Sequence, residues 1–339
     1  MKALTWQGKG DVQVRDVPDP RIQESTDAII QVTSTAICGS DLHLYEVLGP
    51  FLSPGDVLGH ETMGVVQEVG ADVHDIAVGD RVVIPFNISC GSCWMCTRGL
   101  MAACETTQVR EQGKGAALFG YTELYGSVPG GQAELLRVPQ AHFGPIKVPH
   151  DHPDERFLFL SDILPTAWQA VKFAELPSEG TLAVLDLTEG RGADGTLDAV
   201  GMEAHGSPVL GGAIKAVAHV PDALAKPMIK KVGVDRLAAL QGAISAVRRG
   251  GSVSVSGVYG GMADPMPMME MFDKGISLRM GQCHVKRWIG EILPVVMEDG
   301  DVLGLESLAT HRLPLAEAAR GYDIFQKKSD GCVKVVLEP

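Results

Sequence analysis

Four cysteines fall within fifteen residues of the sequence, at a spacing that suits metal ligation. Cys90, Cys93, Cys96 and Cys104 form the pattern C-x2-C-x2-C-x7-C. Two-residue gaps let successive thiolates converge on one ion, and four sulfurs without an open position are typical of structural zinc. An iron–sulfur run has its fourth cysteine after three residues and before proline, whereas Cys104 follows a gap of seven and precedes glutamate. The spacing therefore predicts a structural zinc site, with disulfides or free thiols as the remaining alternatives.

A second set of possible metal ligands lies upstream. The segment CGSDLH runs from Cys38 to His43 after a predicted strand, and Gly59, His60 and Glu61 follow about twenty residues later. Cysteine and histidine both bind zinc, and a catalytic site uses three protein ligands and keeps one coordination position open. Taken alone, each piece favours a buried cysteine and two ordinary surface histidines, so the case depends on their combination.

The elements that must position these residues fall into two kinds. Residues 1–150 are dense in short apolar runs bounded by Gly, Pro or Asp, which predicts a compact all-β unit. From about residue 180, strand patterns alternate with helical patterns such as the one at 235–249, which indicates a parallel sheet covered by helices. The tail at 313–339 predicts a helix followed by a short strand.

Composition and charge exclude several classes of protein. A chain of 339 residues exceeds what one hydrophobic core usually supports. The net charge of −13 argues against nucleic-acid binding, and no run of 18 apolar residues could span a membrane. The start, MKALTWQGKG, lacks the apolar core of a secretory signal. Clustered cysteines suggest metal ligation in a reducing compartment, so we expect a cytoplasmic protein.

In their order and spacing, C-G-S-D-x-H, G-H-E and the four-cysteine run resemble the zinc-dependent medium-chain alcohol dehydrogenases. The segments SVPGGQAELLRVP, LSDILPTAWQAV and RGADGTLDAVGMEAHG are most similar to the glutathione-independent formaldehyde dehydrogenases of that family. The resemblance covers nearly the whole chain. It implies an α/β plus β fold: a GroES-like zinc catalytic domain at 1–160, a truncated Rossmann domain with a doubly wound parallel sheet at 161–295, and a return to the catalytic domain at 296–339.

The resemblance also implies the ligands of a catalytic zinc, which makes two zinc ions per chain. Cys38, His60 and Asp162 would hold the ion, with the aspartate in place of the cysteine found in other members. Glu61 would be an occasional fourth ligand. Asp41 would orient His60, as zinc-bound histidines usually require.

Further roles follow from the same resemblance. Ser40 and His43 would relay the proton of a substrate hydroxyl to solvent. The zinc would act as a Lewis acid on a small alcohol or aldehyde, and NAD would carry the hydride. The resemblance implies a homo-oligomer, a dimer or a tetramer, with no nucleic-acid or membrane partner.

The sequence GRGADG contains a literal G-x-G-x-x-G at Gly190, Gly192 and Gly195. A dinucleotide fingerprint must follow a strand, open a helix and precede an acidic residue some twenty positions later. Here the following TLDAVG predicts a strand, and Ile, Lys and Ala occupy 214–216, where the acid should stand. We interpret the three glycines as a turn that leads directly into a strand.

By comparison with the family, the chain lacks about fifty residues between Val184 and Leu187. Those residues would include the true glycine turn and the ribose-binding acid. A helix face covering on the order of 500 Å² contributes about 12 kcal/mol. Whole domains are stable by only about 5–15 kcal/mol. Loss of such a helix would therefore unfold or rearrange the Rossmann domain, unless another chain covers the exposed sheet. The third alternative is that the protein contains these residues and the sequence lacks them. We expect a discontinuity at 184–186.

The rest of the cofactor site persists in the resemblance. The positions implied to contact the cofactor are Thr166, Val200, Gly201, Gly257, Val258, Tyr259, Gly281, Gln282 and, facing the pyrophosphate, Lys334. Two functions remain open: a zinc- and NAD-dependent dehydrogenase, or a zinc-binding protein without dinucleotide binding that has a structural or regulatory role. A quinone oxidoreductase of the same fold is disfavoured, because those relatives lack the zinc ligands.

Overall fold

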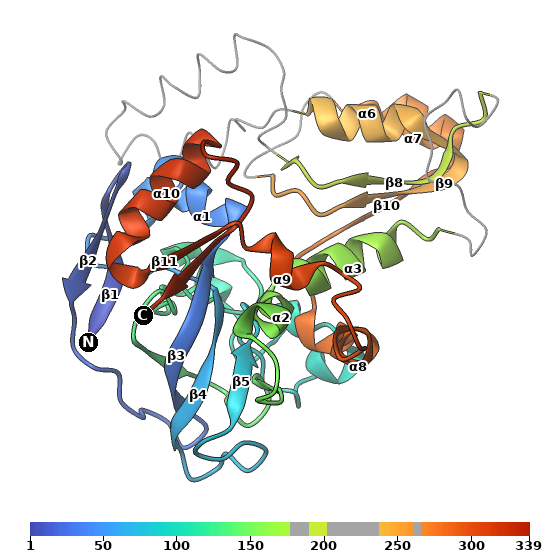
Figure 1. The fold of residues 1–339 in the computed structure, drawn as a ribbon. Helices are drawn as coiled ribbons and strands as arrows, with labels where there is room; N and C mark the ends of the chain where they lie inside the picture. Colours follow the sequence, from blue (N-terminus) through green and yellow to red (C-terminus); the bar gives the residue numbers. More distant parts are fainter. Residues whose placement is uncertain (177–189, 202–236, 260–265) are drawn as a thin grey trace. The chain divides into compact units, whose positions relative to one another are not determined.

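The computed structural model describes residues 1–176, 190–201, 237–259 and 266–339 (Figure 1). The chain divides into two compact units. The first comprises Met1–Pro165 and His284–Pro339, and the second comprises Thr166–Cys283.

The first unit is built around a mostly antiparallel sheet, as its short apolar runs predict. Among its described residues, seven strands form this sheet in the order β11-β12-β3-β4-β5-β7, with β6 paired to β3, and β1 and β2 form a separate hairpin. The bounds are β1 Lys2–Gly8, β2 Asp11–Asp16, β3 Ala28–Ile37, β4 Glu61–Val69, β5 Arg81–Ile84, β6 Leu135–Val138, β7 Ile146–Lys147, β11 His311–Pro314 and β12 Val335–Glu338.

Helices join and cover this sheet. They are α1 Gly39–Glu46, α2 Asp154–Leu158, α8 Val285–Val296, α9 Leu305–Leu308 and α10 Ala318–Lys327. The helix and strand predicted for the tail are confirmed as α10 and β12. Tyr322 on α10 is fully buried in one core cluster with Ile37 of β3 and Val335 of β12. This packing fixes the end of β3, from which the candidate site begins.

The second unit contains a parallel sheet, as predicted. Strands β8 Ala193–Asp198, β9 Val247–Val255 and β10 Ser277–Met280 lie in the order β10-β9-β8. Its helices with described bounds are α6 Ala238–Ala246 and α7 Met268–Lys274, and α3 Ile163–Phe173 enters the unit from the first.

The helix predicted from the pattern at 235–249 was wrong at its C-terminal end. Helix α6 ends at Ala246, and β9 begins at Val247. Val247 is only 1% exposed and pairs with Ala193 of β8. Burial in a strand pair therefore overrides the helical spacing of the local sequence.

The structure confirms the interpretation of the G-x-G-x-x-G match. Gly190 and Gly192 have positive φ angles of 78° and 93° in a turn, and Gly195 lies within strand β8. No helix begins within four residues of Gly195, so these glycines do not cradle a phosphate at a helix N-terminus. The discontinuity expected at 184–186 lies outside the described residues.

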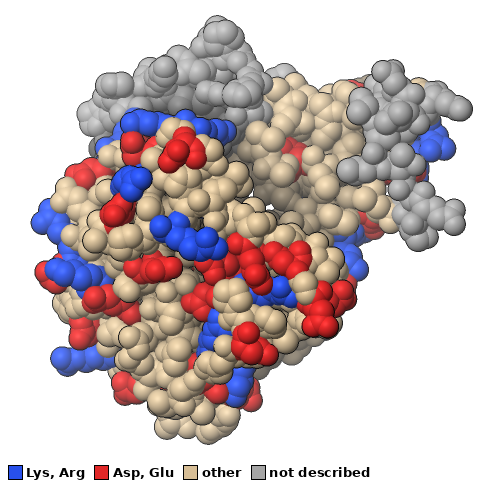
Figure 2. Space-filling model, viewed as in Figure 1, with Lys and Arg blue, Asp and Glu red and all other residues tan. Residues whose placement is uncertain are grey.

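No helix in the described part of the chain is both long and apolar enough to cross a membrane. On the face shown in Figure 2, acidic and basic side chains are interspersed over the first unit.

Candidate catalytic metal centre and cysteine lobe

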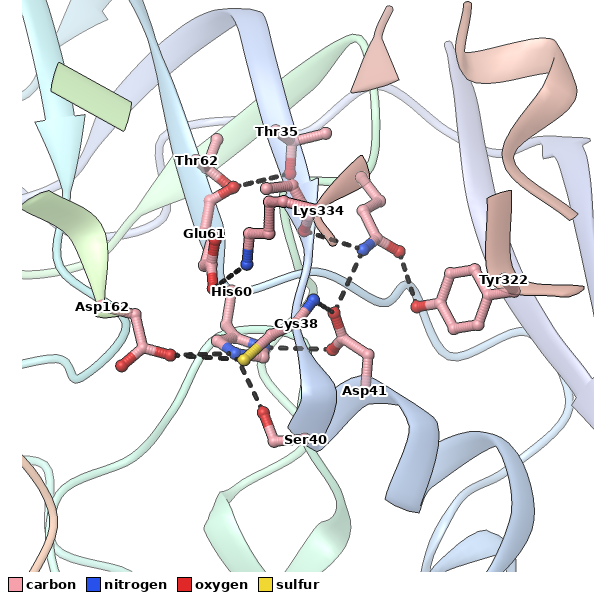
Figure 3. A network of polar contacts seen from close by, with 12 residues as sticks. Thr35, Cys38, Ser40, Asp41, His60, Glu61, Thr62, Asp162, Tyr322 and Lys334 are labelled. Atoms are coloured by element: carbon pink, nitrogen blue, oxygen red, sulfur yellow. Dashed lines mark hydrogen bonds and ion pairs between the residues drawn. The ribbon is translucent and has the colours of Figure 1, made fainter. Parts of the chain in front are cut away.

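The sequence C-G-S-D turns the chain sharply at the end of β3. Cys38 is the N-cap of α1, and its backbone N–H donates a hydrogen bond of 2.9 Å to Oδ2 of Asp41. This is the reciprocal half of a capping box, in which the third residue of the helix reaches back to the cap. It holds the Cys38 thiol and the Ser40 hydroxyl on the side of the turn that faces His60 (Figure 3).

Strand pairing places His60 beside Cys38. Glu61 begins β4 and pairs with Ala36 of β3, so the start of one strand lies beside the end of the other. Gly59 precedes His60 with a φ of 99°, a conformation that only glycine adopts readily. Residues about twenty positions apart in sequence are thereby brought within ligating distance.

Asp162 completes a cluster of possible ligands. It follows a short 3-10 helix, Phe159–Ser161, which is anchored by a hydrogen bond of 3.0 Å from the Phe86 N–H to the Ser161 carbonyl. Donor atoms of Cys38, His60, Glu61 and Asp162 all lie within 4.8 Å of one another.

The spacing within this cluster suits zinc. Oδ2 of Asp162 lies 3.3 Å from Nε2 of His60 and 3.8 Å from Sγ of Cys38. Zinc bonds of about 2.0 Å to nitrogen or oxygen and about 2.3 Å to sulfur give tetrahedral edges of about 3.3 Å and about 3.5 Å for these two pairs. The residues therefore fit the ion that their chemistry implies.

Asp41 holds His60 in the orientation that ligation requires. Nδ1 of His60 lies 3.1 Å from Oδ1 of Asp41, and both side chains are buried. A carboxylate is an acceptor, so it favours the tautomer with the proton on Nδ1 and leaves the Nε2 lone pair facing Cys38 and Asp162. Burial alone lowers the pKa of His60, but the Asp41 charge and the hydrogen bonds around the ring raise it well above the ordinary value.

Burial also raises the pKa of the Cys38 thiol, and the nearby Glu61 charge adds to this effect. A bound cation would favour the thiolate instead, because the thiolate is the form that ligates metal. The cluster therefore releases protons when it takes up an ion.

Glu61 has a buried partner of opposite charge. Nζ of Lys334 lies 2.7 Å from Oε1 of Glu61, and it also lies 5.8 Å from the centre of the Phe159 ring. Burial raises the pKa of Glu61 and the Lys334 charge acts in the opposite direction. The resemblance implied a pyrophosphate-facing role for Lys334. The structure places its ammonium group against Glu61, and the role toward a cofactor stays a prediction.

The two residues expected to relay a proton lie on α1. Oγ of Ser40 is 3.2 Å from Nε2 of His60, and His43 is half-buried three positions further along the helix. Tyr121 packs against the His60 ring with 5.4 Å between ring centres. The His60 ring is thus bordered by the Ser40 hydroxyl and by two aromatic rings, since Phe86 lies 6.4 Å away between ring centres.

The four-cysteine run forms a separate lobe. The sulfurs of Cys90, Cys93, Cys96 and Cys104 lie within 4.8 Å of one another, and no disulfide joins them. Sγ of Cys93 and Sγ of Cys104 are 3.9 Å apart, close to the edge of about 3.8 Å expected for a zinc–sulfur tetrahedron.

Hydrogen bonds around the lobe lower the pKa of Cys90 and Cys93, while burial raises the pKa of Cys96. Sγ of Cys90 accepts from Oγ1 of Thr106 at 3.1 Å and from the Cys93 N–H at 3.4 Å. Burial raises the pKa of Cys90, but the hydrogen bonds from Thr106, Ser92 and the backbone outweigh burial and lower it to about 5. Thiolates are the ligating form, so the lobe suits structural zinc.

In the second unit, most of the positions implied to contact a cofactor gather at one edge of the sheet. Val200 and Gly201 follow β8, 257–259 follow β9, and 281–282 follow β10. Ligands of doubly wound sheets bind outside the carboxyl ends of parallel strands, and this is that edge. Thr166 lies on α3.

Asp198, which the sequence did not single out, organises this edge. Its Oδ1 accepts hydrogen bonds from the N–H groups of Val200, at 3.0 Å, and Gly201, at 3.2 Å. The Tyr259 hydroxyl donates to its Oδ2. The sequence signal that could have identified it is its position, an acidic residue at the end of a predicted strand, two residues before Val200.

A cavity of about 830 Å³ in the second unit lies at the opposite edge. It is lined by 190–192, Asp194, Ser245, 247–249 and Lys274. These residues belong to the amino ends of β8 and β9 and to the ends of α6 and α7, so the cavity is separate from the strand ends implied to bind a cofactor.

Comparison with known proteins agrees with this geometry. Residues 24–149 match the family model for the alcohol dehydrogenase GroES-like domain. The chain is 36% identical to the uncharacterized zinc-type alcohol dehydrogenase-like protein AdhB of Bacillus subtilis, over 401 aligned positions that cover 100% of both chains. It is 28% identical to a glutathione-independent formaldehyde dehydrogenase of Pseudomonas aeruginosa, covering 96% of this chain and 94% of that protein.

Among solved structures, the alcohol dehydrogenase TADH from Thermus sp. ATN1 superposes with a TM-score of 0.79 and 28% identity, covering 100% of this chain and 99% of that one. A GroES-like domain followed by a Rossmann-like domain defines the medium-chain dehydrogenase fold, as predicted. The chain belongs to the zinc-type alcohol dehydrogenase family of oxidoreductases.

Proposed function

We propose that this chain is a zinc-dependent dehydrogenase that transfers a hydride between an alcohol or aldehyde of formaldehyde-like size and NAD. The carrying observation is the cluster of Cys38, His60 and Asp162, whose donor atoms have tetrahedral spacing. Of the four candidate ligands, Glu61 would bind weakly, because Lys334 neutralises its charge. The other three would hold the ion. Such a site keeps a position open for substrate, unlike the four-sulfur lobe.

The protein groups around the cluster support this chemistry. When bound, zinc would polarise the substrate oxygen as a Lewis acid, and NAD would accept or donate the hydride. Ser40 Oγ would accept the proton of an alcohol as its own hydroxyl proton leaves toward His43, three residues further along α1. Asp41 would keep the proton of His60 on Nδ1, and Tyr121 would restrict the room beside the ring.

Turnover of short alcohols and of formaldehyde with NAD, followed by NADH absorbance, tests this function. Asp162→Ala should abolish turnover, while Asp151→Ala, which removes an exposed acid outside the cluster, should retain it. A fully active Asp162→Ala protein would show that the aspartate is not a ligand.

Two observations favour a second function, a zinc-binding protein that does not bind dinucleotide. The turn at 190–195 is no phosphate cradle. In addition, the alignment with AdhB runs over 401 positions against the 339 residues of this chain, so at least 62 of them (401 less 339) have no counterpart here. Two zinc ions per chain without NADH binding or turnover would support this alternative, whose role would be structural or regulatory.

We also propose that the chain forms a homo-oligomer through the edge of its parallel sheet. All four residues of β10 are exposed, and Met269 and Phe272 of α7 are 78% and 84% exposed. Among the described strands of this sheet β10 stands at one end, and a second copy related by a two-fold axis would pair its own β10 antiparallel to it. Sedimentation should show a dimer or tetramer that Met280→Lys weakens.

A further inference from the structure

Four buried side chains form a continuous polar path from α10 to the candidate metal centre. Oη of Tyr322 donates to Oε1 of Gln132 at 3.0 Å, and Nε2 of Gln132 donates to Oδ2 of Asp41 at 3.4 Å. The path ends at His60, whose Nδ1 lies 3.1 Å from the other oxygen of Asp41. Tyr322, Gln132 and Asp41 are 0% exposed and His60 is 2% exposed.

We propose that Gln132, oriented by Tyr322, is a positioning residue for this centre: it holds the Asp41 carboxylate in place and thereby sets the orientation of the His60 ring. The inference rests on the proposed metal centre and adds a further layer of residues behind Asp41.

The surroundings of Gln132 allow its amide only one orientation. Nε2 faces two acceptors, Oδ2 of Asp41 and, at 3.2 Å, the carbonyl oxygen of Ala36. A reversed amide would place its oxygen against both, which leaves buried acceptors facing one another without a proton. Tyr322 then completes the arrangement, because its hydroxyl can donate to Oε1.

This arrangement gives one oxygen of Asp41 two donors and leaves the other beside the His60 ring. Oδ2 of Asp41 accepts from the Cys38 N–H at 2.9 Å and from Gln132, which leaves Oδ1 for His60. Without the Gln132 donor, the carboxylate would lose one of the contacts that fix its plane. Outer contacts of this kind set ring orientation and basicity in metal-bound histidines.

Backbone hydrogen bonds hold Gln132 beside the metal centre. The Gln132 N–H donates to the Leu58 carbonyl at 3.0 Å and the Gly131 N–H donates to Gly59 at 2.8 Å, so the segment lies directly against the turn before His60. A Cβ at Gly59 would lie 2.4 Å from Cγ of Gln132. The SVPGGQ and GHE segments are therefore one packed unit, and the glycines permit the close approach.

The test uses the full chain loaded with Co²⁺ in place of zinc, in wild type and in Gln132→Met and Tyr322→Phe. Methionine keeps the approximate shape of glutamine but has no N–H donor. Tyr45→Phe is the matched control, since the Tyr45 ring packs against Tyr322 at 5.5 Å without belonging to the path. Visible cobalt absorption and the rate of metal loss to a chelator are measured, and cobalt in the four-cysteine lobe serves as an internal standard for folding.

Gln132→Met should weaken retention at the Cys38 centre about 10-fold, the lower end of the range for residues behind metal ligands, and should shift its cobalt bands. Tyr322→Phe should weaken it about 3-fold, as expected for one lost hydrogen bond. The double variant should be no worse than Gln132→Met, because the two residues act in series. Tyr45→Phe should match wild type.

The outcomes are distinguishable. If wild type binds Co²⁺ at both sites and the Gln132 and Tyr322 variants match it in spectrum and retention, the inference is wrong while the proposed function stands. If wild type binds metal only in the lobe, the proposed metal centre fails, and the inference fails with it.

Discussion

The ammonium group of Lys334 lies 2.7 Å from the carboxylate of Glu61, and the two side chains are only 5% and 0% exposed. The pair borders the candidate metal centre, because a donor oxygen of Glu61 lies within 4.8 Å of the donor atoms of Cys38, His60 and Asp162. A buried carboxylate beside a cation site would compete to ligate the ion. Lys334 offsets that charge, which agrees with the prediction that Glu61 would be only an occasional fourth ligand.

Removing one partner should therefore destabilise the fold strongly. Lys334→Met leaves a buried, unpaired carboxylate, a change that typically costs about 3–5 kcal/mol of unfolding free energy. Chemical denaturation of the zinc-loaded protein measures it. Adding Glu61→Gln should recover most of the loss, whereas Lys327→Met, which breaks the exposed pair with Asp323, should cost about 1 kcal/mol or less. Equal effects of the two lysine changes would refute the argument.

The Lys334–Glu61 pair also shows what the sequence alone could not provide. The four-cysteine lobe was predictable because its spacing is local, and Cys38, His60 and Asp162 were identified as candidates through a family motif. The partner of Glu61 depends instead on β12 lying beside β3, with Val335 opposite Ile37. Local patterns carry no information on such a pairing, which joins residues 273 positions apart.

Dependence on distant contacts also explains two further points that the sequence did not reveal, the role of Gln132 and the end of α6. Gln132 stood in a segment quoted for the resemblance, yet its role depends on contacts with Asp41 and Tyr322 from distant parts of the chain. The predicted end of α6 was wrong because Val247 is buried in a strand beside Ala193, which is more favourable than one more helical turn. Tertiary packing decided both.

Metal content should distinguish the two sites. Wild type should contain two zinc ions per chain, and Cys38→Ser should contain one, because the lobe binds independently. Cys104→Ser should instead lose the lobe ion and much of the stability. Cys332→Ser is the control, since this thiol belongs to neither cluster. Elemental analysis giving one zinc or fewer for carefully prepared wild type would contradict the assignment.

The proton relay should show itself in the pH dependence of turnover. His43→Ala should slow turnover mainly at low pH, where solvent bases that could replace the imidazole are scarce. The measurement is kcat with NAD across pH, with His150→Ala, at an exposed position outside the site, as the control. A uniform loss at every pH would point to a structural role for His43.

His284 should make stability depend on pH. Its Nδ1 accepts a hydrogen bond of 3.1 Å from the Ala102 N–H, which requires an unprotonated nitrogen. Burial, with a smaller contribution from the Arg287 charge, lowers its pKa to about 4. The unfolded chain protonates this residue near pH 6.5. Its stabilising contribution is therefore complete above about pH 6.5 and is lost as pH falls toward 4.

Comparison with His284→Asn isolates this contribution, because asparagine keeps an acceptor for the Ala102 N–H but does not titrate. After a discount for partial exposure, wild type should lose about 1–2 kcal/mol more than the variant between pH 7 and pH 4. Urea unfolding at several pH values provides the measurement. Parallel pH profiles for the two proteins would mean that His284 is protonated in the folded state as readily as in the unfolded chain.

Cofactor affinity should reflect the turn at 190–195. A pyrophosphate needs backbone N–H groups at a helix N-terminus, but Gly195 lies inside β8 and the preceding glycines form a turn. We therefore expect this 339-residue chain to bind NADH with millimolar affinity at best in a fluorescence titration. Millimolar binding would make turnover require correspondingly high NAD, and absent binding would support the alternative of a zinc-binding protein without dinucleotide binding. Insertion of a phosphate-binding segment of about fifty residues after Val184 should restore tight binding. Tight 1:1 binding by the chain without the insertion would show that another part of it supplies the phosphate turn.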